Sequence, residues 1–403
     1  MNIAALEWLT FGLSRAVSAA AERGCVLHLL TADRTEYAFE VERSIPGNLV
    51  VHDVDTSDAD QVLKVLSSID DLAGLISTTD VCSLIALDVA AQLGLPAQKA
   101  DAVRLVRNKA ALRRNLHERG LTRSGPVEFD PHQARIDELQ RILPLPAIIK
   151  DVSGTGSQAV WMARRPEDIP GIVEQARAAN LRGGGLTAEP YFTGPLYSAE
   201  TISWDGRTRL LGVSSRVMSP LPHFREEATA FPVAFPEADQ QQIQEWVSTV
   251  LDGIGYRGFA HTEFIITGDG PEVVEVNPRL GGGLIGENIC RAYDVNVYGA
   301  FLDMALDRRP ELLDAPLTLL RGMAEADVLA GRTGTFDGFE GEELLAGHPG
   351  APVLCPSRPL GDPVDSLTDW RASVGNVIAE GATTEIALHN ALSAVRLLHA
   401  RVS

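Results

Sequence analysis

Cysteine is scarce in this chain, and long apolar runs are missing. The only cysteines, Cys25, Cys82, Cys290 and Cys355, are dispersed and lack the paired spacing of a disulfide framework or a zinc site. No apolar run approaches the roughly 20 residues of a membrane span. The N-terminus has no basic segment and carries Glu7, which favours strand, loop and helix over a signal peptide. These absences predict a cytoplasmic protein with reduced, mostly core cysteines and no membrane contact.

Positive charge is also in short supply. The chain has 35 Lys and Arg against 54 Asp and Glu, a formal net charge of −19. This balance argues against nucleic acid or an anionic membrane as a main partner. A polyanionic ligand would need a local group of lysines and arginines, or a metal. The length of 403 residues is enough for two or three domains.

The first hundred residues alternate strand and helix patterns, which is typical of a parallel sheet. The expected strands are NIAAL, VLHLL, LVVHDVD and LAGLIST, and the expected helices are SRAVSAAAERG, ADQVLKVLSSI and SLIALDVAAQLG. The first strand-to-helix turn, LTFGLS, lacks the G-x-G-x-x-G fingerprint, so a Rossmann-like shape here does not imply NAD. It remains a candidate wall of a ligand site, because open α/β sheets bind ligands at the carboxyl ends of their strands.

The remaining chain mixes helices with antiparallel strand patterns. We expect one basic helix over 102–120, and two strands joined by a Gly/Ser loop within 146–163. We also expect a helix over PEDIPGIVEQARAAN, the strand TAEPYF, and an antiparallel pair turning at Asp205-Gly206. A third compositional zone begins near Pro310 and ends in an amphipathic helix over 384–402. The stretch 219–232 shows no helix or strand pattern and is either a specificity loop or a plain surface loop.

The stretch EVNPRLGGG, residues 275–283, carries the strongest chemical signal. Strand alternation places Glu275, Asn277 and Arg279 on one face. The preceding HTEFIITGDGPEVVEV is typical of a β-hairpin, and symmetric pairing about its loop puts Glu263 opposite Glu275 and His261 opposite Asn277. Two facing carboxylates with an amide oxygen suit Mg²⁺ (or Mn²⁺) that shares its other sites with phosphates. The alternative is a solvated hairpin without a metal, which the apolar flanking residues disfavour.

Two further segments suggest a nucleotide. Lys150 ends an apolar strand before a Gly/Ser loop whose backbone N–H groups can cover phosphates; it is not a Walker A loop, and alone it would be an ordinary hairpin. In TAEPYF, Glu189 and the backbone near Tyr191 and Phe192 can bind a purine edge, although a plain edge strand fits as well. In the Gly/Ser loop after Lys150, the residues expected to cover phosphates are Ser153, Gly154, Gly156 and Ser157.

Together these segments resemble the ATP-grasp superfamily of carboxylate-amine ligases, most closely the bacterial L-amino acid ligases that make dipeptides. The resemblance spans nearly the whole chain. It matches Asn108, Lys109 and Arg113 to the basic helix that opens the ATP domain, and Lys150 with its loop to the strand lysine. The family pattern E-x-Y-[ILF]-x-G falls on Glu189, Tyr191 and Gly194, and the metal motif E…E-x-N-P-R-x-G-G-G falls on Glu263, Glu275, Asn277, Pro278, Arg279 and Gly281 to Gly283.

The chain departs from the family at a few positions. Relatives often carry an acid two residues after Gly194, where this chain has Leu196; Glu200 could replace it only if the local register shifts. Arg216 is the candidate for a further phosphate-binding base. His261 falls where some peptide-forming relatives hold an arginine against the intermediate, and it either hydrogen-bonds substrate or is a core histidine.

The resemblance implies an α/β ATP-grasp fold in three parts: a Rossmann-like pre-ATP-grasp domain (1–100), a two-subdomain ATP-grasp domain (101–308) and a small C-terminal lid domain (309–403). It implies an ADP-forming ligase that joins a small-molecule carboxylate, expected to be an amino acid, to an amine through an acyl phosphate. In that reading Arg279 and His261 act at the reacting groups. Family members are often homodimers, but no sequence feature identifies an interface. Two alternatives are a bicarbonate-dependent carboxylase of the biotin carboxylase or purine-pathway type and a non-catalytic ATP-binding module.

Overall fold

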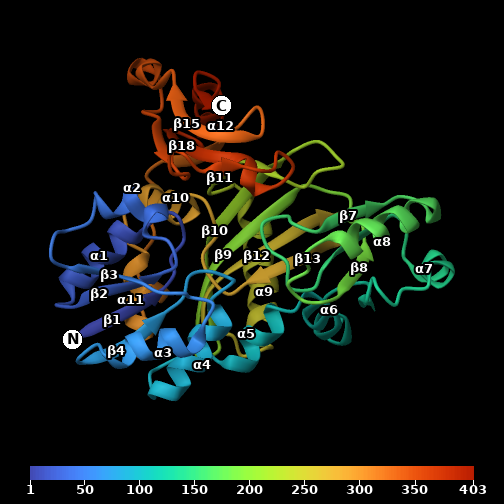
Figure 1. Ribbon diagram of the computed structural model, residues 1–403, viewed down its shortest axis with the longest axis horizontal. Coiled ribbons are helices and arrows are strands. Elements are labelled where there is room, and N and C mark those ends of the chain that lie inside the picture. The colour runs from blue at the N-terminus through green and yellow to red at the C-terminus, as the bar shows by residue number, and fades with distance from the viewer.

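The computed structural model describes residues 1–403. Its N-terminal part contains a four-stranded parallel sheet (Figure 1). Its strands are Asn2–Leu6 (β1), Val26–Thr31 (β2), Leu49–Asp53 (β3) and Leu72–Ile76 (β4), in the order β3-β2-β1-β4. The helices are Leu13–Glu22 (α1), Ala38–Val41 (α2), Ala59–Ser67 (α3) and Ser83–Leu93 (α4). All strand pairs are parallel, as the sequence predicts. The strand order reverses between β1 and β4, which is where such sheets bind ligands.

The basic segment after this sheet is two helices, so the prediction of one continuous helix over 102–120 is wrong. The structure has Ala100–Val106 (α5) and Lys109–Glu118 (α6). Asn108 takes an extended conformation between them, and its side chain accepts a hydrogen bond from the Ala111 N–H at 2.9 Å. Asparagine favours such a capping position over a helix interior because its side chain competes for backbone N–H groups. The break places Lys109 at the first position of α6.

A small antiparallel sheet follows, in the order β5-β8-β6-β7. Its strands are Val127–Phe129 (β5), Ala147–Asp151 (β6), Val160–Ala163 (β7) and Leu186–Pro190 (β8), and its helices are Ile136–Ile142 (α7) and Ile169–Ala178 (α8). The expected pair of strands around the Gly/Ser loop is confirmed as β6 and β7. The strand that carries Glu189, β8, lies between β5 and β6, so it is not an edge strand.

An eight-stranded antiparallel sheet occupies the centre of the molecule, in the order β13-β12-β9-β10-β11-β14-β18-β16. Its strands are Leu196–Trp204 (β9), Arg207–Met218 (β10), Glu226–Phe231 (β11), Gly258–Thr267 (β12), Gly270–Asn277 (β13), Gly322–Leu329 (β14), Val353–Pro356 (β16) and Ser373–Gly381 (β18). The antiparallel pair turning at Asp205-Gly206 is confirmed as β9 and β10. The stretch 219–232 contains the strand β11, so neither loop interpretation of it holds for the whole segment.

The C-terminal part continues this sheet, because β14 pairs with β11. Beyond it lie a three-stranded sheet of Gly334–Glu340 (β15), Pro363–Val364 (β17) and His399–Val402 (β19) and the helix Thr384–Val395 (α12). The helix expected over 384–402 therefore ends early, and its last residues form a strand instead. Glu237–Asp252 (α9) packs on β10. No helix of the chain combines the length and apolar character needed to cross a bilayer.

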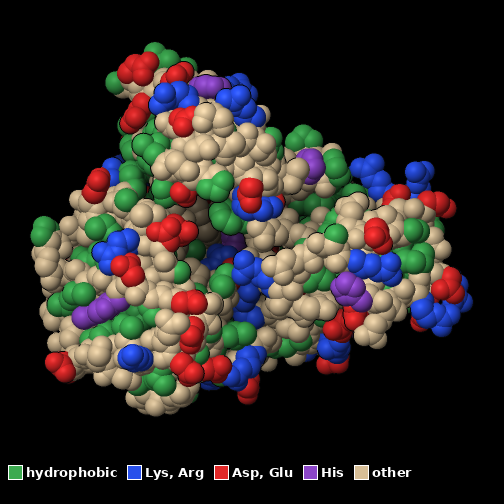
Figure 2. All heavy atoms as spheres, viewed as in Figure 1, with side chains coloured by type: hydrophobic (Ala, Val, Ile, Leu, Met, Phe, Trp, Pro, Cys, Tyr) green, Lys and Arg blue, Asp and Glu red, His purple; other side chains and the backbone are tan.

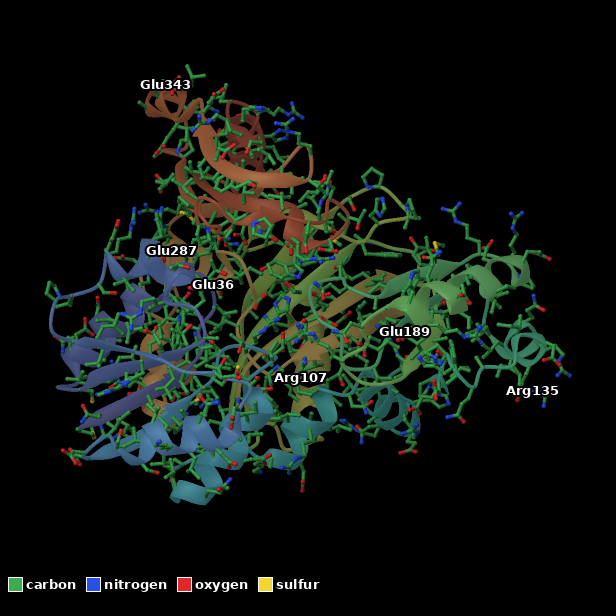
Figure 3. All side chains as sticks on the ribbon, in the orientation of Figure 1. Glu36, Arg107, Arg135, Glu189, Glu287 and Glu343 are labelled. Carbon is green, nitrogen blue, oxygen red and sulfur yellow. The ribbon has the colours of Figure 1, made fainter.

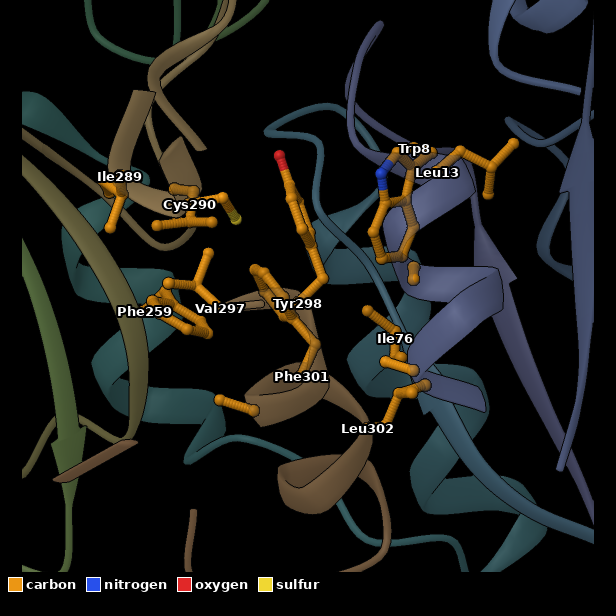
Figure 4. Packing of buried hydrophobic residues seen from close by; sticks show 14 of the residues in the cluster. Trp8, Leu13, Ile76, Phe259, Ile289, Cys290, Val297, Tyr298, Phe301 and Leu302 are labelled. Carbon is orange, nitrogen blue, oxygen red and sulfur yellow. The ribbon is translucent and has the colours of Figure 1, made fainter. Parts of the chain in front are cut away.

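The largest hydrophobic core joins the parallel sheet to the helices Ile285–Tyr293 (α10) and Tyr298–Ala305 (α11) that follow the EVNPRLGGG motif (Figure 4). Trp8 lies within 6.1 Å of Tyr298 and 5.9 Å of Phe301, ring centre to ring centre. Each fully buried side chain of this size contributes about 1.5–3 kcal/mol. This packing fixes the carboxyl edge of the parallel sheet beside the end of β13. All four cysteines are buried and unpaired, as predicted.

Candidate active site

The register of the β12–β13 hairpin is the one predicted at its polar positions. Glu263 pairs with Glu275, and His261 pairs with Asn277. The pairing is nevertheless not symmetric about a single loop residue, because Thr267 and Gly270 enclose a two-residue turn and the register shifts by one between Glu263 and Phe264. This bulge leaves Val274 without a pairing partner, and its carbonyl accepts a hydrogen bond from Lys150 Nζ at 3.1 Å. A bulge beside a polar site is a common way to aim groups at a ligand.

Glu275 is held in its ionised form by neighbours on one side of the hairpin. Lys109 Nζ lies 3.1 Å from its Oε2, and Asn277 Nδ2 donates to its Oε1 at 2.9 Å. Burial alone would raise the pKa of Glu275, but Lys109, Asn277 and Lys150 outweigh it and hold the pKa well below its usual range. With its Nδ2 on Glu275, Asn277 keeps its Oδ1 available for a cation.

Glu263 is neutralised from the other side of the hairpin. Arg216 Nη2 lies 3.4 Å from its Oε1, and His261 Nε2 lies 3.3 Å from the same oxygen. Burial opposes ionisation, yet the net pKa of Glu263 is lowered because the Arg216 guanidinium favours the anion. The two facing carboxylates are therefore both anionic, each with its own cations.

His261 is fully engaged by protein groups. Its Nδ1 lies 2.8 Å from Glu200 Oε1, and its Nε2 lies 3.0 Å from Arg216 Nη1 besides Glu263. Burial lowers the pKa of His261, but Glu200 and Glu263 outweigh this and raise it to about 9. The side chain is 2% exposed, an environment that fits the core-histidine interpretation, and as an imidazolium it donates to Glu200 and Glu263 but has no lone pair left to accept from Arg216. Glu200 is completely buried in continuous pairing with β12, so this pairing lacks the register shift that Glu200 would need to replace the acid missing at Leu196.

Lys150, Glu189 and Arg113 form one buried ion network. Lys150 Nζ contacts Glu189 Oε1, and Arg113 Nε donates to Glu189 Oε2 at 2.9 Å. Burial acts to raise the pKa of Glu189, but the charges of Lys150 and Arg113 outweigh burial and keep this pKa below its usual value. Burial lowers the pKa of Lys150, and Glu189 opposes that change. Both oxygens of Glu189 thus already have cationic partners.

The hinge that follows Glu189 is packed against Pro146, the residue before β6, and against β12. The Tyr191 N–H donates to the Pro146 carbonyl at 2.8 Å, and Phe192 is 8% exposed beneath the guanidinium of Arg113. At Gly194 a Cβ would lie 2.1 Å from the Ile266 carbonyl oxygen, so only glycine fits. The hinge pattern therefore has a packing reason independent of any ligand.

The Gly/Ser loop lies close to three other segments. Asp151 accepts the Ser153 N–H at 2.9 Å, and Lys109 Nζ contacts the Gly154 carbonyl. Ser157 Oγ donates to the Phe224 carbonyl at 2.7 Å. Gly156 has a φ of +62°, and a Cβ there would lie 2.2 Å from Trp370 of the C-terminal part. The structure thus brings Lys109 and Lys150 together with this loop, as the sequence predicts.

Arg279 has a partner that the sequence did not suggest. Its Nε donates to Asp80 Oδ2 at 2.8 Å, and its Nη1 donates to the Leu280 carbonyl at 2.8 Å. Arg107, labelled in Figure 3 near the junction of the N-terminal and central parts, lies 3.2 Å from Asp80 Oδ1. Asp80 follows β4, 199 residues before Arg279, and no local pattern links the two.

Two carboxylates near Arg216, the half-buried Glu226 and the buried Glu325, were also missed. Glu226 on β11 contacts Arg216 Nη2, and Glu325 on β14 lies opposite Thr229 of β11 and faces Gly283. Burial raises the pKa of Glu226 and raises that of Glu325 further. The alternation of EEATAF is a weak strand signal that could have identified β11, whereas nothing in the sequence places β14 beside it.

The donor set of the hairpin fits Mg²⁺ better than a transition metal. No three acidic, histidine or cysteine side chains converge in a metal-ready cluster. The set is instead two opposed carboxylates, Glu263 and Glu275, and the amide of Asn277. Such a small oxygen set suits a hard cation that keeps waters or phosphate oxygens in its remaining positions. A space-filling view shows a hollow between the three parts, where Lys, Arg and His side chains gather (Figure 2).

Comparison with known proteins identifies two domains in this chain. A family model of the ATP-grasp domain matches residues 106–283, and a model of the L-amino acid ligase C-terminal domain 2 matches residues 328–403. An L-amino acid ligase from Bacillus licheniformis superposes with a TM-score of 0.82 at 19% identity, covering 100% of this chain and 98% of that chain.

Sequence relatives are distant but extensive. The uncharacterized protein y4rH of Sinorhizobium fredii is 26% identical over 367 residues, 87% of this chain and 72% of that protein. Human carnosine synthase 1 is 25% identical over 319 residues, 74% of this chain, and the match spans only 39% of the human protein. The chain therefore contains an ATP-grasp domain followed by an L-amino acid ligase C-terminal domain.

Proposed function

We propose that this protein is an ATP-dependent ligase that joins the carboxylate of an amino acid to an amine and releases ADP and phosphate. The observation that carries the proposal is the convergence of Glu263, Glu275 and Asn277 with Lys109 and Lys150 beside one Gly/Ser loop. Two opposed anions for a divalent cation, next to two lysines for phosphates, are the requirements of phosphoryl transfer from Mg-ATP. The relatives named as an L-amino acid ligase and a carnosine synthase support an amino acid as the acid substrate.

The reaction proceeds in two balanced steps. A carboxylate oxygen of the acid attacks the γ-phosphorus of ATP, the bond to the β-phosphate oxygen breaks, and an acyl phosphate and ADP result. The amine then attacks the acyl carbon, loses a proton, and the phosphate leaves with the oxygen that came from the carboxylate. No nucleophile from the protein is required, so the protein acts by positioning and by charge neutralisation.

Each side chain has a proposed part in these steps. Lys109 and Lys150 bind phosphate oxygens, with Ser153, Gly154, Gly156 and Ser157 covering them. Glu189, Tyr191 and Phe192 border the adenine, with Arg113 fixing Glu189. Arg279 orients the carboxylate through its remaining N–H donors, and His261 donates to Glu263 and holds it in place. Mg²⁺ or Mn²⁺, held by Glu263, Glu275 and Asn277, would supply further neutralisation of the phosphates.

Exclusion of water is the remaining requirement, because water would hydrolyse the acyl phosphate. Three segments meet beside the site: the Gly/Ser loop, residues 219–225 and residues 366–372. Ser157 Oγ bonds the Phe224 carbonyl, and Arg225 contacts the Leu367 carbonyl. Trp370 packs on Gly156. These contacts suit a cover shared by the ATP-grasp domain and the C-terminal domain.

The test is ADP release from Mg-ATP with single amino acids, amino acid pairs and bicarbonate, with mass spectrometry of the products. The proposal expects ADP and a new amide mass with a particular pair, and neither in Glu275→Ala. ADP release that requires bicarbonate and no amino acid would support the carboxylase alternative. Tight ATP binding without ADP from any mixture would support a nucleotide-binding module and contradict the ligase.

A further inference from the structure

Asp80 is the residue of the N-terminal sheet that reaches the ATP-grasp motif. It lies in the loop after β4, its side chain is 5% exposed, and its carboxylate contacts both Arg279 and Arg107. On the basis of the proposed ligase function, we propose that Asp80 is a positioning residue that orients Arg279 toward the carboxylate of the acid substrate. It would not touch substrate itself, since its oxygens face the two guanidinium groups.

The donors of Arg279 support this role. A guanidinium has five N–H groups in a fixed plane. Asp80 Oδ2 accepts from Nε at 2.8 Å and also from Nη2, and the Leu280 carbonyl accepts from Nη1 at 2.8 Å. These bonds leave one N–H on each terminal nitrogen without a protein acceptor. Two donors on adjacent nitrogens of one rigid plane are suited to a carboxylate, and the plane is set by Asp80 and Leu280.

The second oxygen of Asp80 extends the arrangement to the Gly/Ser loop. Arg107 Nη1 lies 3.2 Å from Oδ1, and Arg107 Nη2 donates to the Ser153 carbonyl at 3.4 Å. Arg107 sits in the break between α5 and α6, two residues before Lys109. One carboxylate therefore hydrogen-bonds the arginine aimed at the acid through Oδ2, and through Oδ1 it forms an ion pair without a hydrogen bond to an arginine that contacts the loop expected over ATP.

The position of Asp80 in the loop after β4 of the parallel sheet also supports this role. β4 lies next to β1, and the strand order reverses between them. Loops at the carboxyl ends of two such strands border the crevice in which open α/β sheets bind ligands. The loop is fixed there, because Thr78 Oγ1 accepts the Leu9 N–H at 2.9 Å and Ser83 Oγ donates to the Asp80 carbonyl at 3.0 Å. The N-terminal sheet thus presents a rigid carboxylate at the edge of the site.

The kinetic test compares Asp80→Asn with Asp88→Asn. Asp88 also pairs with an arginine, Arg104 at 2.7 Å, but it is 58% exposed and remote from Arg279 in this network. With the amino acid pair for which the wild type yields an amide, Asp80→Asn should raise the KM of the acid at least tenfold and leave the KM of ATP within twofold. Asp88→Asn should change neither. Equal changes in both KM values, or none, would overturn the proposal.

A second measurement does not depend on turnover or on knowing the substrate. In protein labelled with ¹⁵N-arginine, the Arg279 Nε–H signal can be assigned by its loss in Arg279→Lys. That proton should exchange slowly with solvent in the wild type and in Asp88→Asn, and much faster in folded Asp80→Asn. The same slow exchange in Asp80→Asn would overturn the role of Asp80. Failure of the wild type to form any amide would instead count against the ligase function.

Discussion

Two groups of carboxylates, partly or fully buried, lie on the same eight-stranded sheet, and their pKa values are shifted in opposite directions. The pKa values of Glu263 and Glu275 on the β12–β13 hairpin are lowered. Those of Glu226, Glu325 and Asp327 on β11 and β14 are raised. Burial by itself acts to raise the pKa of all five carboxylates, so burial does not explain why two of the net pKa values are lowered and three are raised.

Neighbouring cations make the difference. Arg216 contacts both groups, through Glu226 and through Glu263. Lys109 adds a second cation to the hairpin at 3.1 Å from Glu275. Glu325 has only the Leu284 N–H as a hydrogen-bond donor. The sheet therefore carries two carboxylates with lowered pKa values at its β12–β13 edge and three with raised pKa values on the inner strands β11 and β14, where no lysine forms an ion pair with them.

Removal of a hairpin anion should have the largest effect. Glu275→Ala should lower the rate of ADP release at least about 10³-fold and weaken Mg-ATP binding, because one of two opposed ligands is lost. The chain should stay folded. Steady-state ADP release, calorimetric titration with Mg-ATP and thermal unfolding measure the three effects. Glu245→Ala, an exposed position on α9, is the matched control. Normal turnover in Glu275→Ala would end the metal assignment.

Removal of the cation beside that anion should have the next largest effect. Lys109→Met should lower kcat/KM for ATP about 100-fold, because it removes a charge proposed to bind phosphate and leaves Glu275 with fewer favourable neighbours. Lys64→Met, at an exposed position on α3, should be unchanged. Steady-state kinetics at varied ATP decides the matter: equal kinetics in both variants would mean that Lys109 serves only to stabilise the hairpin.

The acids with raised pKa values should show their effect in the pH dependence of stability. Burial raises the pKa of Asp327 to about 7, although Ser373 and Asn376 donate to it. The folded state then keeps a proton that the unfolded chain loses above about pH 4. Its stabilising contribution is present below pH 4 and is lost as the pH rises through about 7.

Asp327→Asn should therefore lack this pH-dependent contribution to the free energy of unfolding. Relative to the wild type, the variant should gain on the order of 1–3 kcal/mol between pH 4 and pH 8 in the free energy of unfolding. Urea unfolding at both pH values measures the difference. Parallel pH profiles for wild type and variant would show that Asp327 is ionised in the folded protein.

The smallest effect is expected from a substitution at Trp370, a residue of the C-terminal domain that contacts the Gly/Ser loop and neither group of carboxylates. Trp370 packs on Gly156 of the Gly/Ser loop and is 56% exposed. Trp370→Ala should raise the ratio of ADP to amide severalfold, because water would reach the acyl phosphate more often. Trp370→Phe keeps an aromatic face and should retain a ratio near that of the wild type. An unchanged ratio in the alanine variant would exclude Trp370 from the cover.

Local periodicity explains which parts of this architecture were predictable. The hairpin register at Glu263 and Glu275 follows from strand alternation, and the strands of the parallel sheet follow from short apolar runs. The expectation of uninterrupted symmetric pairing about the loop was wrong, because a two-residue turn combined with a bulge gives the same register at the polar positions. The break at Asn108 required recognition of a capping residue inside a basic helix pattern.

The missed residues are those whose neighbours are distant in the chain. Asp80 meets Arg279 only because the core around Trp8 and Tyr298 holds the parallel sheet against the segment after β13. Glu325 meets Leu284 only because β14 extends the central sheet. Such contacts depend on how domains pack, and no spacing in the sequence encodes them. The division at residues 100 and 308 stays a proposal, since the central sheet crosses the second boundary.

The most direct test of the ligase mechanism follows an oxygen atom. The acid substrate is labelled with ¹⁸O in its carboxylate, incubated with Mg-ATP and the amine, and the released phosphate is analysed by mass spectrometry. Formation of an acyl phosphate predicts one ¹⁸O atom in each phosphate released with the amide. Amide formation with ADP and unlabelled phosphate would contradict the acyl phosphate and, with it, the roles proposed for Lys109, Lys150 and Arg279.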